Sequence, residues 1–192
     1  IGNLLVFLVL NIIVLLIALA FNLAVSDLQI SWISYLNYFL LISVPTLVFI
    51  MGLSFFFMSV LRNQALTFII LLGYVALTLF YLQNKFYFVF DYMAFRIPLA
   101  YSDFVGFGNK STLLIHRGIY FFLGLSFIFL TIPFLKRLPQ AKHFRQFPVV
   151  VSAVFFIAGV YLAYLHVDSV VTENNNRKEM LVINDSYASE KA

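Results

Sequence analysis

The ionisable residues best placed to do chemistry in this chain lie between residues 83 and 118. Asp91, Arg96 and Asp103 stand there among nine aromatic side chains. Charges near lipid are costly unless they are paired or hydrated, and they often mark a translocation pathway. The stretch predicts either an interfacial lid held by aromatic anchors or an outer gate, and a gate can be built from such a lid. The candidate gate residues are Asp91, Arg96, Pro98, Tyr101, Ser102, Asp103, Gly106 and Gly108.

Four further polar residues lie beside apolar runs. His116 and Arg117 come near the start of one run, and we expect them to snorkel to the outer interface, with a pathway role as the alternative. His166 and Asp168 resemble a metal pair, but two ligands are too few for a zinc site. Polar residues at the end of a helix are the simpler interpretation of that pair.

The elements that must position these residues are long and apolar. Of 192 residues, 63% are apolar and 10% charged, where a soluble domain carries about 25% charge. Runs of roughly 18 to 28 apolar residues are typical of membrane-spanning helices. We predict an all-α membrane protein with about five transmembrane helices and an outer re-entrant or interfacial helical hairpin. The expected spans are residues 4–25, 33–61, 65–82, 113–135 and 149–165.

Breaks in these runs give the connections. Pro45 lies inside the second span and predicts a kink there, which is either a hinge or a packing feature. Arg62-Asn63-Gln64 predicts a very tight turn. Within 83–118, a short helix over 84–95 and a second segment over 99–105 are expected, separated by Pro98 and ended by Gly106 and Gly108.

Charge placement predicts the orientation. Lys136, Arg137, Lys142 and Arg145 form a basic connector after the fourth span, and Arg62 lies in the turn after the second. Basic residues in short loops face the cytoplasm. With five spans, both connections fall on that side, and all eight acidic residues fall on the other. Residues 83–118 and 167–192 are therefore expected to be extracytoplasmic. We expect the connector to set the topology and to meet anionic lipid.

The chain turns polar after residue 166. Val167–Val171 and Met180–Ile183 could begin a strand-containing soluble domain. Because the first residue is Ile1 and lies within an apolar run, we interpret the chain as a piece of a longer protein.

The order of spans, and above all the motif Tyr101-Ser102-Asp103-x-x-Gly106-Phe107-Gly108, resembles ABC-2-type transporter permeases of a bacterial subset. Some of that subset are joined to an extracytoplasmic peptidase-like region. The resemblance covers roughly residues 1–137. It implies a partial permease bundle over 1–148, an additional transmembrane helix over 149–166 and the start of an extracytoplasmic segment over 167–192.

The same resemblance implies a bacterial inner-membrane protein that pairs with a second permease, as a homodimer or otherwise, and docks ATP-binding subunits. No Gly-x-x-x-x-Gly-Lys-Ser/Thr phosphate loop occurs in the sequence, so ATP and Mg²⁺ are expected in a partner ATPase. Contact with this cytoplasmic ATPase is the alternative role of the basic connector. The chain itself is not expected to be an enzyme, to hold a cofactor or metal, or to bind nucleic acid. The alternative function is a membrane anchor, sensor or scaffold for an extracytoplasmic domain. An intramembrane enzyme ranks last, since the spans offer almost no ionisable residues.

Overall fold

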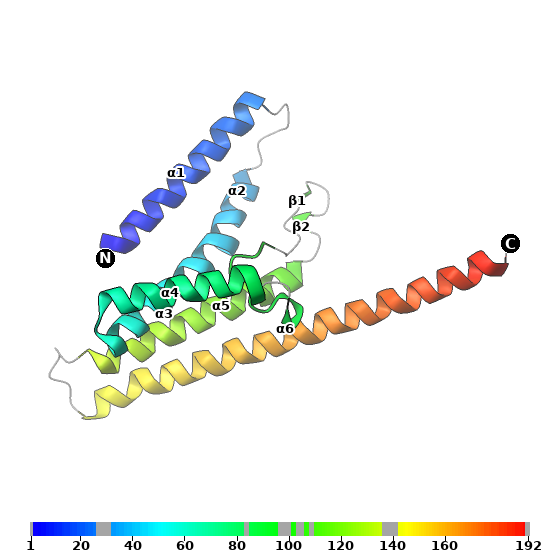
Figure 1. Cartoon of the computed structure of the whole chain (residues 1–192). Coiled ribbons are helices and arrows are strands. Elements are labelled where there is room, and N and C mark those ends of the chain that lie inside the picture. The colour runs from blue at the N-terminus through cyan, green and yellow to red at the C-terminus, as the bar shows by residue number, and fades with distance from the viewer. Residues whose placement is uncertain are drawn as a thin grey trace.

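The computed structural model describes residues 2–25, 32–82, 85–95, 101–102, 106–107, 110–135 and 142–190. These residues are almost wholly helical (Figure 1). Five helical stretches are long and apolar enough to cross a membrane, as the sequence predicts. They are Leu5–Val25, Tyr35–Leu61, Gln64–Leu82, Lys110–Phe134 and Gln146–Asn184.

The first three stretches comprise α1 to α4. Helix α1 is Gly2–Val25, and α2 (Trp32–Tyr38) continues through a π-helical turn, Phe39–Ser43, into α3 (Val44–Leu61). Pro45 lies in the first turn of α3, directly after that wide turn. A π turn thus lies just before the proline at which the sequence predicts a kink, and both the kink and the hinge stay predictions. Helix α4 (Gln64–Leu77) also runs into a π turn, Thr78–Leu82.

Only Arg62 and Asn63 separate α3 from α4, which confirms the tight turn. Arg62 ends α3 in the left-handed conformation, with φ 53°, and donates its N–H to the carbonyl of Met58. The Asn63 side chain accepts a hydrogen bond of 3.2 Å from the N–H of Leu66. Asn63 therefore caps α4 in the way that favours asparagine at helix starts.

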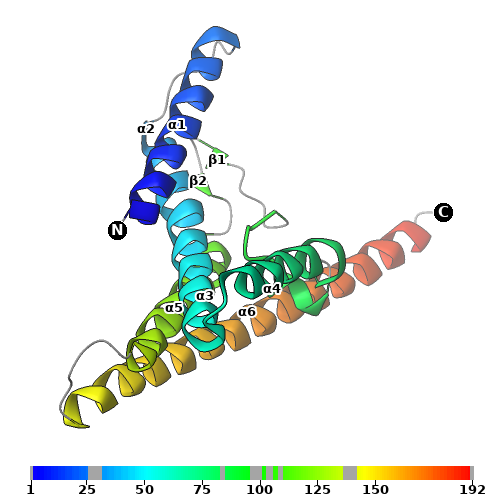
Figure 2. The same cartoon turned by 60° about the vertical axis from the view of Figure 1, so that its left-hand side comes forward.

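Helix α5 is Lys110–Thr131, continued by a 3-10 turn, Ile132–Phe134, and α6 is Lys142–Glu190. Helix α5 lies between α3 and α6 at the centre of the bundle (Figures 1 and 2). Glycines allow the close approach. A Cβ built on Gly52 of α3 would lie 2.3 Å from the carbonyl oxygen of Gly124 on α5. On the other side, a Cβ on Gly159 of α6 would lie 2.9 Å from the Leu123 side chain. Small residues at helix contacts are a common basis of packing in membranes.

A reciprocal serine pair joins α5 to α6. Ser126 Oγ donates to the carbonyl of Ser152 over 3.0 Å, and Ser152 Oγ donates to the carbonyl of Ser126 over 2.9 Å. Both side chains are buried. Interhelical hydrogen bonds of this kind contribute on average about 0.6 kcal/mol each in a membrane protein.

Helix α1 makes little contact with the rest of the bundle. All its described side chains are exposed or half-buried. Asn22 donates its Nδ2 to the hydroxyl of Tyr35 on α2 over 2.9 Å. Asn11 instead donates to the carbonyl of Phe7 in its own helix.

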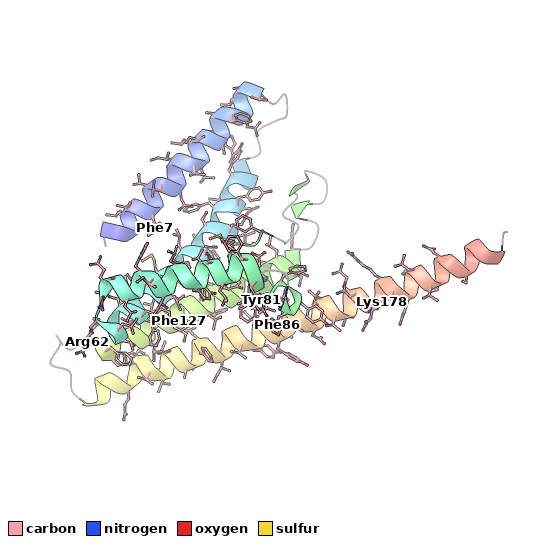
Figure 3. All side chains as sticks on the ribbon, viewed as in Figure 1. Phe7, Arg62, Tyr81, Phe86, Phe127 and Lys178 are labelled. Atoms are coloured by element: carbon pink, nitrogen blue, oxygen red, sulfur yellow. The ribbon has the colours of Figure 1, made fainter. Side chains whose placement is uncertain are left out.

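Two sequence predictions about the polar segments are wrong. Helix α6 continues without interruption through residue 190, so residues 167–171 and 180–183 are helical and form no strands. Its second half, which carries Lys178, projects beyond the other helices (Figure 3). Apolar β-branched residues favoured the strand interpretation. Extending a helix that has already formed needs no new nucleus, however, so α6 continues through these residues.

The short helix expected over 84–95 is likewise not formed. Within 85–95, only the three-residue turn Phe86–Phe88 is helical, and the remaining residues form turns. Strands β1 (Tyr101–Ser102) and β2 (Gly106–Phe107) pair in antiparallel register, in place of the second helical segment. The predicted pair of half-length helices is therefore replaced by irregular backbone and a short strand pair in the parts that the structure describes.

Candidate functional site

Residues 85–95, called the loop segment below, begin in an unusual backbone conformation. Phe86, Tyr87 and Phe88 have φ values of 53°, 56° and 63°, so they make one left-handed turn without glycine. A left-handed conformation costs roughly 1–2 kcal/mol per residue that carries a Cβ. Such a turn persists only where surrounding contacts hold it.

Those contacts come from four buried side chains of α5 and α6, each of which meets a different backbone carbonyl of the loop segment. The Nε2 atoms of His166 and His116 lie 3.1 Å from the carbonyl oxygens of Tyr87 and Phe88, respectively. Tyr120 donates its hydroxyl to the carbonyl of Val89. Arg117 Nη2 donates to the carbonyl of Tyr92 over 2.9 Å. We call this set of hydrogen bonds, from His116, Arg117, Tyr120 and His166, the loop latch.

Arg117 also extends the loop latch to α3. Its Nη2 donates to Thr46 Oγ1 over 2.8 Å, and Thr46 Oγ1 in turn donates to the carbonyl of Tyr92 over 3.1 Å. The guanidinium carbon lies 5.6 Å from the centre of the Tyr120 ring, within the range of a cation–π contact. One buried arginine therefore ties α3, α5 and the loop segment together.

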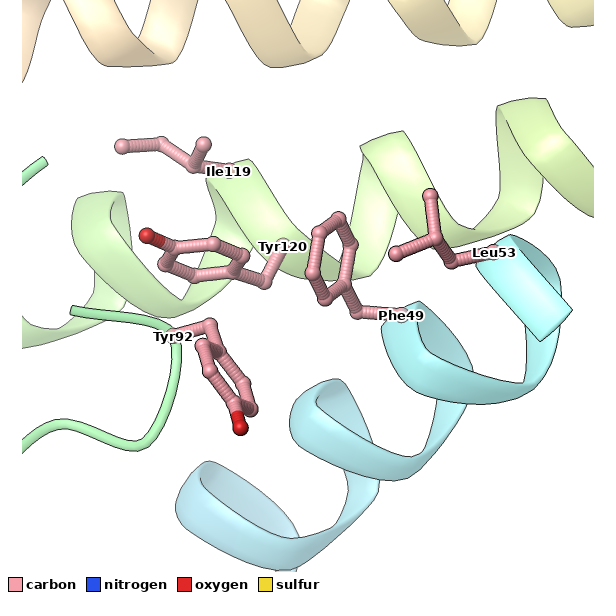
Figure 4. Close-up of a cluster of buried hydrophobic side chains, with 5 residues drawn as sticks. All are labelled: Phe49, Leu53, Tyr92, Ile119 and Tyr120. Carbon is pink, nitrogen blue, oxygen red and sulfur yellow. The ribbon is translucent and has the colours of Figure 1, made fainter. Parts of the chain in front are cut away.

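An aromatic cluster supports the same contact from the inside (Figure 4). Tyr92 of the loop segment points between α3 and α5, where its ring centre lies 6.1 Å from that of Phe49 and 6.4 Å from that of Tyr120. Tyr74 of α4 lies 5.9 Å from Tyr92. Aromatic pairs at these separations contribute about 0.5–1.5 kcal/mol each beyond burial. The loop segment is thus packed into the bundle and does not merely lie over it.

Asp91 brings a carboxylate into this environment. It is 4% exposed, and it acts electrostatically on Arg117 and on Tyr92. Burial, followed by the charge of Asp91, raises the pKa of the Tyr92 phenol above its ordinary value. Tyr92 therefore stays protonated at neutral pH. The cluster combines an acid, a guanidinium and two imidazoles, all of them buried. Burying such groups within a membrane protein is costly, and they often mark functional sites.

The two histidines of the loop latch lie against each other. Their ring centres are 5.0 Å apart, and the rings are tilted by 56°. Because each Nε2 faces a carbonyl oxygen, each Nε2 carries a proton and donates it. Each Nδ1 is buried, and neither has a hydrogen-bond partner among the described residues. Arg117 Nε, Arg117 Nη1 and the Tyr92 hydroxyl are in the same situation.

A partly open cavity of about 290 Å³ lies next to the loop latch. It is bounded by α3, α4, α5, α6 and the loop segment, and its lining includes Tyr74, Phe90, Tyr120, Phe156 and Val160. Its walls are almost entirely apolar. Such a cavity suits an alkyl or aromatic group.

The structure places the predicted gate residues in different surroundings. Asp91 lies in the buried cluster, whereas Tyr101 and Ser102 pair with Phe107 and Gly106 through their backbones. The predicted residues that lie outside the described ones are Arg96, Pro98, Asp103, Gly108, Lys136 and Arg137. Lys142 and Arg145 lie in the first turn of α6, at the same end of the bundle as Arg62 (Figure 3).

The predictions for the three neighbouring polar residues are wrong. His116 and Arg117 do not snorkel, since they are 0% and 2% exposed and bond to the loop segment and to Thr46. His166 does not lie at a helix end but within α6, 2% exposed. Sequence reasoning also missed Tyr120 and Thr46. The available signal was the spacing: residues 116, 117 and 120 lie within about one helical turn, directly after an aromatic loop.

Comparison with known proteins gives no relative: no family model, no curated protein and no solved structure matches this chain. Within the part of the chain that the structure describes, no three His, Cys, Asp or Glu residues are grouped in a way that could hold a metal ion.

Proposed function

We propose that this chain is a permease subunit of an ATP-driven transporter of the ABC-2 type, with the loop segment as a cover over one end of the bundle. The observation that carries the proposal is the loop latch, because buried charged and imidazole groups fix an irregular segment across α3, α5 and α6. Non-helical backbone at membrane depth is tolerated where it is buried in protein or lines a cavity. The motif Tyr101-Ser102-Asp103-x-x-Gly106-Phe107-Gly108 adds the family resemblance.

The arrangement suits a cover that opens in one step. The hydrogen bonds to the loop segment start from three helices, so a relative shift of α3, α5 and α6 breaks several of them together. Release also allows the left-handed turn at Phe86–Phe88 to relax. A partner ATPase would supply the work for such a shift, and a second permease copy would complete the pathway. The basic connector, with Lys142 and Arg145 at its end, is the proposed cytoplasmic contact.

Co-purification tests this function. The full-length protein, isolated from its own membranes in mild detergent through an affinity tag, is expected to bring an ATP-binding subunit with it and to hydrolyse ATP. Substitution of the catalytic residue of that subunit should abolish the hydrolysis. A protein that purifies without any ATPase, at native expression and with intact membranes, contradicts the proposal.

A second candidate function rests on α6. This helix has 49 residues and is about 74 Å long, more than twice the thickness of the membrane core. A stalk of this kind suits a membrane anchor or scaffold that carries an extracytoplasmic domain. Replacing residues 1–135 with an unrelated membrane anchor should preserve activity if the chain is only a scaffold, and should abolish it if the chain is a permease.

A further inference from the structure

The histidine pair gives the loop latch a chemical property that the proposed transport function does not require. His116 comes from α5 and His166 from α6, and their rings meet at 5.0 Å beneath the left-handed turn. Each uses its Nε2 for a loop carbonyl, at 3.1 Å in both cases. The remaining nitrogen of each ring, Nδ1, is buried and unpartnered within the described ranges. In this arrangement both rings are neutral.

We propose that His116 and His166 form a proton-sensitive release for the loop segment, which is held when both imidazoles are neutral and set free when they take up protons. A proton can be added only at Nδ1, which is buried and has no hydrogen-bond partner among the described residues. The added charge would also lie next to Arg117 and the second imidazole, both of which act electrostatically on His116. Burial and like charges both disfavour the protonated form, so protonation favours the arrangement in which the rings reach water.

Among the described residues, the ionisable groups near the pair are engaged with other partners. Tyr120 on α5 already donates its hydroxyl to the carbonyl of Val89. On the loop segment, Asp91 acts on Arg117 and Tyr92. Arg117 is the cation that acts on His116, and Asp91, which acts on Arg117, is the acid to be tested separately.

The sign of the effect follows from proton linkage. The held state binds fewer protons than the released state, so acid shifts the equilibrium toward release, by up to about tenfold per pH unit for each proton taken up. The loop segment is thus expected to be closed in neutral and alkaline solution and to open as the solution becomes acidic. Proton-driven release of the loop segment needs no ATPase. The release can therefore fail while the proposed function holds, and the proposed function can fail while the release holds.

Cysteine accessibility measures release directly, because the chain contains no cysteine of its own. Leu113, in the first turns of α5, is 1% exposed and packs with Ala94 of the loop segment, whereas Ser111 nearby is exposed. Two variants of the full chain, Leu113→Cys and Ser111→Cys, are placed in lipid nanodiscs. Each variant is reacted with an impermeant maleimide between pH 8 and pH 5. Acid lowers the thiolate fraction of both cysteines, so the ratio of the two reaction rates removes this common effect.

We expect the ratio of the Leu113→Cys rate to the Ser111→Cys rate to rise by about tenfold or more as the pH falls through the histidine range. In the His116→Gln/His166→Gln background, the amides still donate to the carbonyls but take up no proton, so the ratio should stay flat. Asp91→Asn should retain the rise. A ratio that stays flat with both histidines present overturns the proposal, even if the glutamine variant does not fold. A rise that persists in the glutamine variant, or that disappears in Asp91→Asn, also overturns it.

Discussion

Gly52 on α3 and Gly124 on α5 meet backbone to backbone. A Cβ on Gly124 would lie 2.6 Å from the backbone nitrogen of Phe49, and one on Gly52 would lie 2.3 Å from the carbonyl oxygen of Gly124. No side chain larger than hydrogen fits between the helices at this crossing. Because Thr46 and Arg117 lie on these same two helices, the crossing also sets the distance that the loop latch spans.

Gly124→Ala is therefore expected to destabilise the bundle. The added methyl group must push α3 away from α5, since it meets backbone atoms that cannot move aside, and overpacking of this kind costs about 1–3 kcal/mol. The measurement is thermal unfolding in detergent. Gly73→Ala is the matched control, because a Cβ there meets no atom within 4 Å. It should leave stability unchanged or raise it by up to about 1 kcal/mol, as alanine does in helices. Equal effects of the two variants would contradict the crossing.

Arg117→Met should free the loop segment. The substitution removes the hydrogen bonds to Thr46 and Tyr92 but keeps an apolar side chain of similar length. Losing a hydrogen bond to a charged group costs about 1.5–3 kcal/mol, so tryptic cleavage after the exposed Lys85 should become at least about tenfold faster. Thr46→Val is the graded control, since it removes only the hydroxyl and should have a smaller effect. Unchanged cleavage in Arg117→Met would show that Arg117 does not hold the loop segment.

The continuous form of α6 gives a distance prediction. Spin labels at Ile157→Cys and Lys178→Cys are separated by 178 − 157 = 21 residues. At a rise of about 1.5 Å per residue, their backbones should lie about 32 Å apart, with a narrow distribution in pulsed dipolar spectroscopy. Asn175→Pro should shorten and broaden the distribution, because proline breaks a helix interior. A broad distribution in the unmodified helix would restore the interpretation of a separate soluble segment after residue 166.

The orientation predicted from charge has a direct test. Phe95→Cys lies on the loop segment, and Gln64→Cys follows the tight turn at Arg62. In intact cells an impermeant thiol reagent should label Phe95→Cys at once, and should label Gln64→Cys only after permeabilisation. The reverse pattern would place the basic connections outside and overturn the orientation.

The number of spans and the limits of the first four could be predicted from the length of the apolar runs, whereas the fifth helix extends far beyond its predicted limit at residue 165. Long apolar runs of the right length leave few alternatives, and Asn63 between two such runs predicts a capped turn. The prediction failed where the contacts are distant in sequence. His166 and Tyr87 are separated by 79 residues, and nothing local indicates that one will bond to the other.

Local backbone propensity also led to a wrong prediction for the loop segment. Phe86, Tyr87 and Phe88 disfavour the left-handed conformation individually, and side chains of α5 and α6 bond to two of their carbonyls. The burial of Arg117 was missed for a related reason. An arginine near the start of a span usually reaches water, whereas here the hydroxyl of Thr46 and a loop carbonyl take the place of water.

The central claim is that an ATPase partner drives the loop segment open, and the most direct measurement is the accessibility of Leu113→Cys in the purified complex. At constant neutral pH, the rate of reaction with an impermeant maleimide should change by about tenfold or more between the nucleotide-free state and the ATP-bound state. The rate for Ser111→Cys should not change. If no ATPase accompanies the chain, or if the rate for Leu113→Cys is the same in both nucleotide states, the account of a latched cover in an ATP-driven permease is contradicted.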